Sequence, residues 1–207
     1  MDGRVAVVTG GARGIRYETI KALQESGAQT AIVDVNAKLG QKAAREFETA
    51  FFQADLTKAE EVKKVADQVQ EKYGRLDIAF NNTGIGVNVP SEDCSDEDWL
   101  RVVNVNLNAV FFCCREFGKI MLRQGKGSII NTASMSGIVS NTTQPQSAYS
   151  ASKGGVRSQP RSSFLLRTEA ACSPSAILWW TADTPAGEGL NQLGGALAIV
   201  SRPTNER

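Results

Sequence analysis

Histidine is absent from the 207 residues of this chain, and its absence removes Ser-His-Asp and Cys-His catalysis and most catalytic zinc sites. Any acid or base must therefore be Tyr, Lys, Asp, Glu or Cys. The four cysteines include the adjacent pair Cys113 and Cys114 but form no C-x-x-C. This spacing predicts neither a disulfide framework nor a zinc knuckle, so we expect no metal site.

Long hydrophobic runs and an excess of either charge are also missing. Lys and Arg number 23 and Asp and Glu 22, for a net charge of +1, which gives no electrostatic reason to expect nucleic acid or an anionic membrane as a partner. No apolar run approaches the length of a membrane span or a signal peptide. We therefore expect a soluble cytoplasmic protein, long enough to bury a sizeable core in one domain.

Short apolar or β-branched runs alternate with segments of helical periodicity over three quarters of the chain. The predicted strands are 4–9, 30–34, 50–55, 76–82 and 127–134, and the predicted helices are 17–26, 37–48, 58–74 and 96–124. Neighbouring parallel strands need a long crossover between them, and here each crossover would be a helix. The alternation predicts an α/β fold: a Rossmann-like, doubly wound parallel sheet with helices on both faces.

The last 50 residues differ in composition. They contain four of the six prolines, two of the three tryptophans and no lysine, whereas ten lysines precede them. The apolar runs 176–180 and 196–200 could each form a strand, but loop-like residues separate them. We expect a dinucleotide-binding domain over 1–157 and an atypical, poorly ordered tail over 158–207.

A glycine-rich turn, TGGARGIR at residues 9–16, follows the first predicted strand. Gly10 and Gly14 would let the backbone turn tightly and approach a pyrophosphate at the N-terminus of the next helix, although a purely structural turn is the alternative. Asp34 ends the second predicted strand, where its carboxylate can accept both adenosine-ribose hydroxyls and repels a 2′-phosphate. NAD is therefore favoured over NADP. Arg13 argues the other way because it could pair with that phosphate, and a solvated strand end is the alternative for Asp34.

The segment QSAYSASKGG, residues 146–155, places Tyr149 and Lys153 four positions apart. In a helix the two side chains emerge on one face, one turn apart. Taken alone, the pattern is more typical of a surface helix with an inward tyrosine and a solvated lysine.

Five motifs together carry a resemblance to a known family: TGGARGIR (9–16), NNTG (81–84), NVNL (104–107), NTASMSG (131–137) and YSASK (149–153). Their order and approximate spacing resemble those of the short-chain dehydrogenase/reductase family, from residue 1 to about 157. The segment SMSGIVSNTTQPQSAYSASK is most similar to polyol and sugar reductases, such as mannitol dehydrogenases and xylulose reductases.

The resemblance implies an NAD(P)-dependent oxidoreductase acting on a secondary alcohol or ketone such as a polyol or sugar. It also implies strand order 3-2-1-4-5, here with the C-terminal strands altered or missing. Family members commonly pair through their long helices, so a homo-oligomer is a further expectation.

The resemblance also gives each catalytic position a role. Tyrosine, with an unperturbed pKa of about 10, is a poor base, but the Lys153 ammonium would favour the phenolate of Tyr149 and hold the nicotinamide ribose. Tyr149 would exchange the hydroxyl proton, and Ser134 would hydrogen-bond the substrate oxygen. Asn106 would fix a water between Lys153 and solvent; by itself it is more often a packing residue.

Further cofactor-binding positions follow from the same motifs. Ile15 lies in the glycine turn, Asp55 and Leu56 correspond to the adenine contact, and Asn82 and Gly84 correspond to the turn beneath the cofactor. For Asp55, an N-cap of the following helix is an equally good interpretation.

Two departures from the family pattern argue against activity. Arg16 occupies the third glycine of the turn motif, where its guanidinium must point to solvent, pair with the pyrophosphate or block it. Pro160 interrupts the helix that carries Tyr149, and no typical sixth strand follows, which indicates a C-terminus replaced by a frameshift or alternative splice. The fifth strand would then be exposed and the pocket would lack its lid. A catalytically impaired nucleotide-binding or interaction protein is therefore the alternative function.

Overall fold

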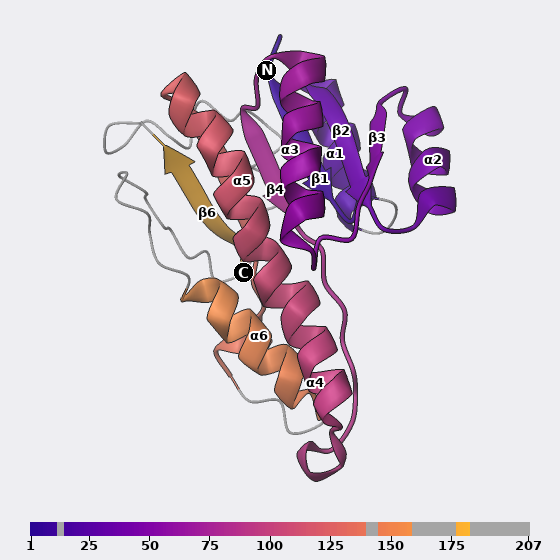
Figure 1. The fold of residues 1–207 in the computed structure, drawn as a ribbon, viewed down its shortest axis with the longest axis vertical. Coiled ribbons are helices and arrows are strands. Elements are labelled where there is room, and N and C mark those ends of the chain that lie inside the picture. Colours follow the sequence, from indigo (N-terminus) through magenta and orange to yellow (C-terminus); the bar gives the residue numbers. More distant parts are fainter. Residues whose placement is uncertain (12–14, 140–144, 159–176, 183–207) are drawn as a thin grey trace, which may run out of the picture.

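A computed structural model describes residues 1–11, 15–139, 145–158 and 177–182, the last six by their backbone alone. At its centre lies one six-stranded sheet of order β3-β2-β1-β4-β5-β6 (Figure 1). The strands are β1 (Val5–Thr9), β2 (Gln29–Asp34), β3 (Ala50–Gln53), β4 (Ile78–Asn81), β5 (Gly127–Thr132) and β6 (Ile177–Ala182). Strands β1 to β5 are parallel, so the predicted doubly wound sheet and its order 3-2-1-4-5 are confirmed.

The helices cover both faces of the sheet because its strands are apolar on both faces. They are α1 (Ile15–Glu25), α2 (Ala37–Glu46), α3 (Ala59–Tyr73), α4 (Asp96–Val103), α5 (Ala109–Gln124) and α6 (Ser147–Arg157). Val5 and Val7 of β1 belong to the core beneath α3 and α5, whereas Ala6 and Val8 belong to the core shared with α1 and α2. This alternation follows from the two-residue period of a strand. No helix in the described part of the chain is both long and apolar enough to cross a membrane.

The prediction of an exposed fifth strand is wrong. Residues 177–182, within which the apolar run ILWW lies, form β6 and pair with β5 along its whole length. β6 runs antiparallel to β5, with Ile177 opposite Thr132 and Ala182 opposite Gly127. An apolar, β-branched and aromatic run has the propensity to cover an open strand edge, and here it does so in the opposite direction to its neighbours. The second apolar run, 196–200, lies outside the described residues.

The single helix predicted over 96–124 is interrupted. Between α4 and α5, Asn104–Asn108 form one turn of π-helix, although the two helices continue one another in space (Figure 1). Such a turn inserts an extra residue and is frequent at functional sites. The short 3₁₀ helices η1 (Ser91–Asp93) and η3 (Met135–Gly137) follow β4 and β5.

Because strands β1 to β5 are parallel, all their carboxyl ends lie at one edge of the sheet and all their amino ends at the opposite edge. At the carboxyl edge, Thr9 of β1 pairs in register with Val33 and Asn81, one residue before Asp34 and Asn82. Ligands of open α/β sheets bind outside this edge, so residues that follow the strands are placed together there.

The amino edge, at the other end of the strands, is closed by polar side chains. The carboxylate of Asp77 accepts the N–H of Val5 at 2.9 Å and two N–H groups of Arg75 at 2.8 and 2.6 Å. The amide of Gln124 accepts the N–H of Leu76 at 2.7 Å and donates to the Leu76 carbonyl at 2.8 Å, as a neighbouring strand would.

Candidate active site

The glycine turn begins directly after β1. Gly10 has φ +65°, the left-handed region that glycine adopts at no steric cost, and its N–H donates to the Val33 carbonyl at 2.6 Å. A Cβ at Gly11 would lie 2.9 Å from Cγ2 of Ile32, so the turn fits tightly against β2. The helix α1 then begins at Ile15, and the orphan N–H groups of its first turn face the carboxyl edge.

Two predicted residues of this turn, Arg13 and Gly14, lie outside the described residues. Ile15 and Arg16 form the start of α1 by their backbone, and their side chains are not described. The roles expected for these four residues stay predictions.

Asp34 lies where it was predicted, as the last residue of β2, with its side chain partly exposed. Its Oδ1 accepts the N–H of Asn36 at 2.9 Å, and Asn36 in turn caps α2 through Leu39 at 2.9 Å. In the described part of the chain no hydrogen bond uses Oδ2 of Asp34. One carboxylate oxygen therefore shapes the turn, and the other is available to a ligand at this edge.

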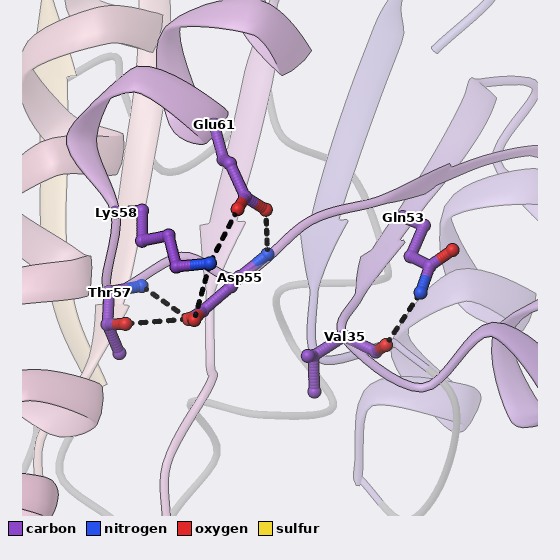
Figure 2. Close-up of polar contacts among 6 residues, drawn as sticks. All are labelled: Val35, Gln53, Asp55, Thr57, Lys58 and Glu61. Atoms are coloured by element: carbon purple, nitrogen blue, oxygen red, sulfur yellow. Dashed lines mark hydrogen bonds and ion pairs between the residues drawn. The ribbon is translucent and has the colours of Figure 1, made fainter.

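Asp55 follows β3 and is drawn with its contacts in Figure 2. Its Oδ1 accepts the hydroxyl of Thr57 at 2.7 Å and the N–H of Thr57 at 3.0 Å, and Lys58 lies 3.7 Å from Oδ2. Partial burial raises the pKa of this carboxyl, but the Thr57 hydrogen bonds and the Lys58 charge outweigh it and hold the pKa below its ordinary value.

The N-cap interpretation of Asp55 is wrong, because Lys58 occupies the N-cap position of α3. Asp55 lies three residues before Lys58, and its carboxylate accepts the N–H of Thr57 in the turn that precedes the helix. The N–H of Asp55 donates to Glu61 at 2.7 Å, which ties this turn to the helix (Figure 2). Leu56, the neighbouring predicted residue, is buried in the core.

The chain after β4 is held by a threonine that the sequence did not single out. The Thr9 hydroxyl accepts the N–H of Asn82 at 3.1 Å and of Thr83 at 3.4 Å, and donates to the Phe80 carbonyl at 3.5 Å. Gly84 then passes close to two candidate site residues, since a Cβ there would lie 3.4 Å from Oδ1 of Asn106 and 3.6 Å from Nζ of Lys153.

Asn106 is fully buried in the π-helical turn. Its Oδ1 accepts the N–H of Ile85 at 2.8 Å, and its Nδ2 donates to the Ile85 carbonyl at 2.9 Å and to the Ser152 hydroxyl at 3.1 Å. The side chain thus anchors the loop after β4, as the packing interpretation expected; the predicted bridging water stays a prediction.

Tyr149 and Lys153 emerge from one face of α6, as their spacing predicts. The Lys153 Nζ lies 5.8 Å from the centroid of the Tyr149 ring and donates to the carbonyl of Thr132, at the end of β5, at 2.7 Å. Lys153 is only 4% exposed, which contradicts the ordinary expectation of a solvated lysine, and Tyr149 is half-buried.

Ser134 begins the loop that joins β5 to α6. Its hydroxyl accepts the N–H of Ser136 at 3.2 Å and caps η3. The loop then meets α6 at Gly137, where a Cβ would lie 2.6 Å from the backbone nitrogen of Gly154. Glycine alone permits this backbone contact, which fixes the loop of Ser134 against the helix of Tyr149 and Lys153.

The buried cysteines are not part of the chemistry. Burial raises the pKa of the Cys113 thiol well above its usual range, with a smaller contribution from Cys114. Burial also raises the pKa of Cys114 to about 11, although hydrogen bonds from Asn131 and Asn81 oppose it. A thiol in this state is not a thiolate at neutral pH, so Tyr149 and Lys153 stay the candidate proton-transfer groups.

The residues at the carboxyl edge fit a dinucleotide. The Gly10 turn and the start of α1 suit a pyrophosphate, and Asp34 offers a carboxylate oxygen one strand away. Thr83 Oγ1 and Thr132 Oγ1 are buried without a hydrogen-bond partner in the described part of the chain. Buried hydroxyls normally find a hydrogen-bond partner, so two unpaired hydroxyls beside Gly84 and Lys153 indicate a place where a polar ligand can bind.

The structure therefore brings together Gly84, Asn106, Tyr149 and Lys153, with the loop of Ser134 packed on the same helix. Asp34 and Asp55 lie at the carboxyl ends of β2 and β3, nearer the Gly10 turn. Sequence reasoning missed three groups at this edge: Thr9, Thr83 and Ser152. Thr9 opens the glycine motif, Thr83 lies in NNTG and Ser152 in YSASK, so their place in the motifs was the available signal.

Comparisons with known proteins agree with this geometry. The profile of the family described as short chain dehydrogenase matches residues 4–164. A galactitol 2-dehydrogenase from Rhizobium johnstonii is 38% identical over 167 residues, which are 78% of this chain and 65% of that protein.

Solved structures give the same picture. The crystal structure of gox2181 is 40% identical with a TM-score of 0.74, covering 75% of this chain and 63% of that one. An NAD⁺-bound xylitol dehydrogenase is 32% identical with a TM-score of 0.71, covering 75% and 61%. The chain thus spans just under two thirds of the length of these relatives.

Proposed function

The chain belongs to the short chain dehydrogenase family, and we propose that it transfers a hydride between NAD and a secondary alcohol or ketone. The observation that carries the proposal is the pair on α6: a buried ammonium 5.8 Å from the ring centroid of a half-buried tyrosine, beside Gly84 at the carboxyl edge. A buried ammonium indicates a functional site, because its removal from water costs free energy unless nearby groups stabilise the charge.

Tyr149 exchanges the proton of the substrate hydroxyl in this mechanism. The positive charge of Lys153, 5.8 Å from the ring centroid, stabilises the negative charge that develops on the Tyr149 oxygen during the proton exchange. The Thr132 carbonyl orients that charge by accepting a hydrogen bond from Nζ at 2.7 Å. NAD, when bound, supplies the hydride acceptor for oxidation or, reduced, the hydride donor.

Ser134 and Asn106 complete the site. The Ser134 hydroxyl, held in the loop against α6, stabilises the developing charge on the substrate oxygen. Asn106 holds the backbone of Ile85 and so fixes the loop that carries Gly84. A water between Lys153 and solvent, if Asn106 binds one, would restore the proton after each turnover.

NAD is the preferred cofactor because Asp34 ends β2. Its unused oxygen accepts the ribose hydroxyls and repels the extra phosphate of NADP. The Gly10 turn and the N-terminus of α1 at Ile15 receive the pyrophosphate, and the predicted contribution of Gly14 belongs to the same proposal. NADP use would depend on Arg13.

The substrate class is a polyol or sugar. Two relatives described by name, the galactitol and xylitol dehydrogenases, support this choice. The catalytically impaired alternative depends on Arg16 and on the tail, whereas Tyr149, Lys153 and Asn106 are assembled in the described residues. Hydride transfer is therefore preferred over binding without chemistry.

A homo-oligomer and a cytoplasmic location belong to the same proposal. Trp99, Leu100 and Phe111 on α4 and α5 are between 41% and 55% exposed. Large apolar side chains left in water along the long helices are suited to pairing with a second copy.

The proposal is tested by following nicotinamide absorbance with galactitol, xylitol and a set of other polyols, using NAD and NADP separately. We expect turnover with NAD, and a fall in kcat/KM of at least about a hundredfold in Lys153→Met. Lys72→Met, which changes a lysine at the amino edge, is the matched control and keeps its activity. Cofactor binding without turnover of any alcohol or ketone would favour the impaired alternative.

A further inference from the structure

Ser152 lies between two residues of the candidate site without belonging to the reacting groups. Its side chain is 1% exposed. The hydroxyl donates to the carbonyl of Tyr149 at 2.7 Å and accepts the Nδ2–H of Asn106 at 3.1 Å. The hydroxyl therefore acts once as a donor, within α6, and once as an acceptor, from a residue 46 positions earlier.

These bonds belong to a longer chain of contacts. Asn106 also holds both backbone groups of Ile85, at 2.8 and 2.9 Å. Ile85 follows Gly84, whose α-carbon faces Nζ of Lys153. Successive contacts thus lead from Tyr149 through Ser152 and Asn106 to Ile85. The neighbour of Ile85, Gly84, lies beside Lys153, which is one helical turn from Tyr149.

The π-helical turn contributes two residues to this contact with α6. Asn106, in the middle of the turn, bonds Ser152, and Leu107 lies against the same helix, since a Cβ at Gly155 would lie 2.8 Å from Cδ2 of Leu107. Two consecutive residues of the turn therefore contact α6, one by a hydrogen bond and one by packing.

A serine that bonds the carbonyl three residues earlier is common in helices and needs no functional reason. The bond from Asn106 is different, because it joins separate elements inside the core. A buried network of this kind is rigid only while every member is paired.

We propose that Ser152 is a positioning residue, which couples the π-helical turn to α6 and so sets the placement of Tyr149 and Lys153 relative to Gly84. The effect of Ser152 on the catalytic rate rests on the proposed hydride transfer. The coupling itself is a property of the fold and can be measured without turnover.

The test compares Ser152→Ala with Ser150→Ala, a partly buried serine on the same helix. We expect Ser152→Ala to lower kcat by about tenfold to a hundredfold, with a change in substrate KM below about threefold, because a small misplacement of reacting groups costs rate more than binding. Ser150→Ala keeps both within about twofold. A lower melting temperature with unchanged kcat would mean that Ser152 only stabilises the fold, and would overturn the role.

Amide hydrogen exchange separates this idea from the proposed function. Loss of the Ser152 hydroxyl should loosen Asn106 and speed exchange at the Ile85 amide by at least about fivefold relative to wild type and Ser150→Ala. If wild type lacks turnover, the proposed function fails, and the exchange result alone decides the coupling. Equal exchange rates at the Ile85 amide in Ser152→Ala and Ser150→Ala would refute the coupling.

Discussion

The two edges of the sheet use polar side chains in different ways. At the amino edge, Asp77 bonds Val5 and Arg75, and Gln124 bonds both backbone groups of Leu76. At the carboxyl edge, hydroxyls of Thr83 and Thr132 stay unpaired in the described chain, and Lys153 is buried beside a tyrosine. Paired groups lower the energy of the folded state, whereas unpaired buried groups cost stability and are kept where a ligand can bond them.

The comparison predicts that substitutions at the amino edge reduce the free energy of unfolding and leave the catalytic rate intact. Substitutions of the proposed site residues at the carboxyl edge should instead reduce the rate or cofactor binding and leave stability nearly unchanged. One pair of tyrosines lets the same change be made at both edges. Tyr149 faces Lys153, and the Tyr73 hydroxyl donates to the Thr30 carbonyl at 3.1 Å near the starts of β2 and β3.

The largest effect is expected for Tyr149→Phe. Losing the proton-transfer group should lower kcat by about a thousandfold, with a melting temperature close to that of wild type. Tyr73→Phe should instead lose about 1 kcal/mol of unfolding free energy and keep its kcat. Steady-state kinetics and urea unfolding of both variants make the measurement. Full activity in Tyr149→Phe would remove the mechanism.

Asp77→Ala should give the next largest effect. It leaves the N–H of Val5 without its acceptor and Arg75 without its partner, which should cost about 3 kcal/mol of unfolding free energy. Urea denaturation is the measurement, and kcat/KM of the folded variant should stay within about twofold of wild type. Asp67→Ala serves as control because the Asp67 side chain is 67% exposed and, among the residues that the structure describes, pairs only with Lys63 across one helical turn. Equal stability of the two variants would contradict the assignment of Asp77 to fold stability.

Asp34→Ser tests the cofactor side of the carboxyl edge. Removing the carboxylate should weaken NAD binding and relieve repulsion of the 2′-phosphate, so the preference for NAD over NADP should fall by about tenfold, or 1.4 kcal/mol. Dissociation constants for both reduced cofactors, from nicotinamide fluorescence, provide the readout. An unchanged ratio would mean that the cofactor preference is set elsewhere, for instance at Arg13.

Asp55→Asn is expected to have the smallest effect and sharpens the comparison, because Asp55 lies at the carboxyl edge but is paired. Its pKa is lowered in the folded state, so its charge stabilises the fold above the ordinary carboxyl pKa of about 3.9. That contribution is lost as the pH falls through the lower folded value. After allowance for solvent screening we expect a loss below about 1 kcal/mol at pH 7, shrinking toward acid pH.

Urea unfolding of wild type and Asp55→Asn over a series of pH values from about 7 down to about 2.5 measures this difference, because the series then crosses the ordinary carboxyl pKa of about 3.9. A difference that grew on acidification would have the wrong sign for a carboxyl with a lowered pKa.

Sequence reasoning was most successful where a local pattern has one structural outcome. The alternation of apolar runs and helices predicted the parallel sheet, and the glycine turn and Asp34 were placed correctly because strand ends follow from the pattern. The spacing of Tyr149 and Lys153 likewise predicted their shared face.

Other features depend on contacts between distant residues, which no local pattern contains. The pairing direction of β6 is decided by which edge of the sheet is open, and its apolar run would suit either direction. The π-helical turn coincides with the bonds that Asn106 makes to Ile85 and Ser152, which are distant in sequence. Lys58, not Asp55, occupies the N-cap position of α3, without a side-chain capping bond. A residue type alone predicts none of these.

The reversed direction of β6 determines on which side of the molecule the chain enters and leaves that strand. Ile177 lies opposite Thr132, whose carbonyl holds Lys153, and Ala182 lies opposite Gly127 at the far end. A sixth strand parallel to its neighbours would instead place its last residue, not its first, next to Thr132 and Lys153. Ala182 therefore lies at the amino edge, about 20 Å along the sheet from Thr132, which is the length of a six-residue strand.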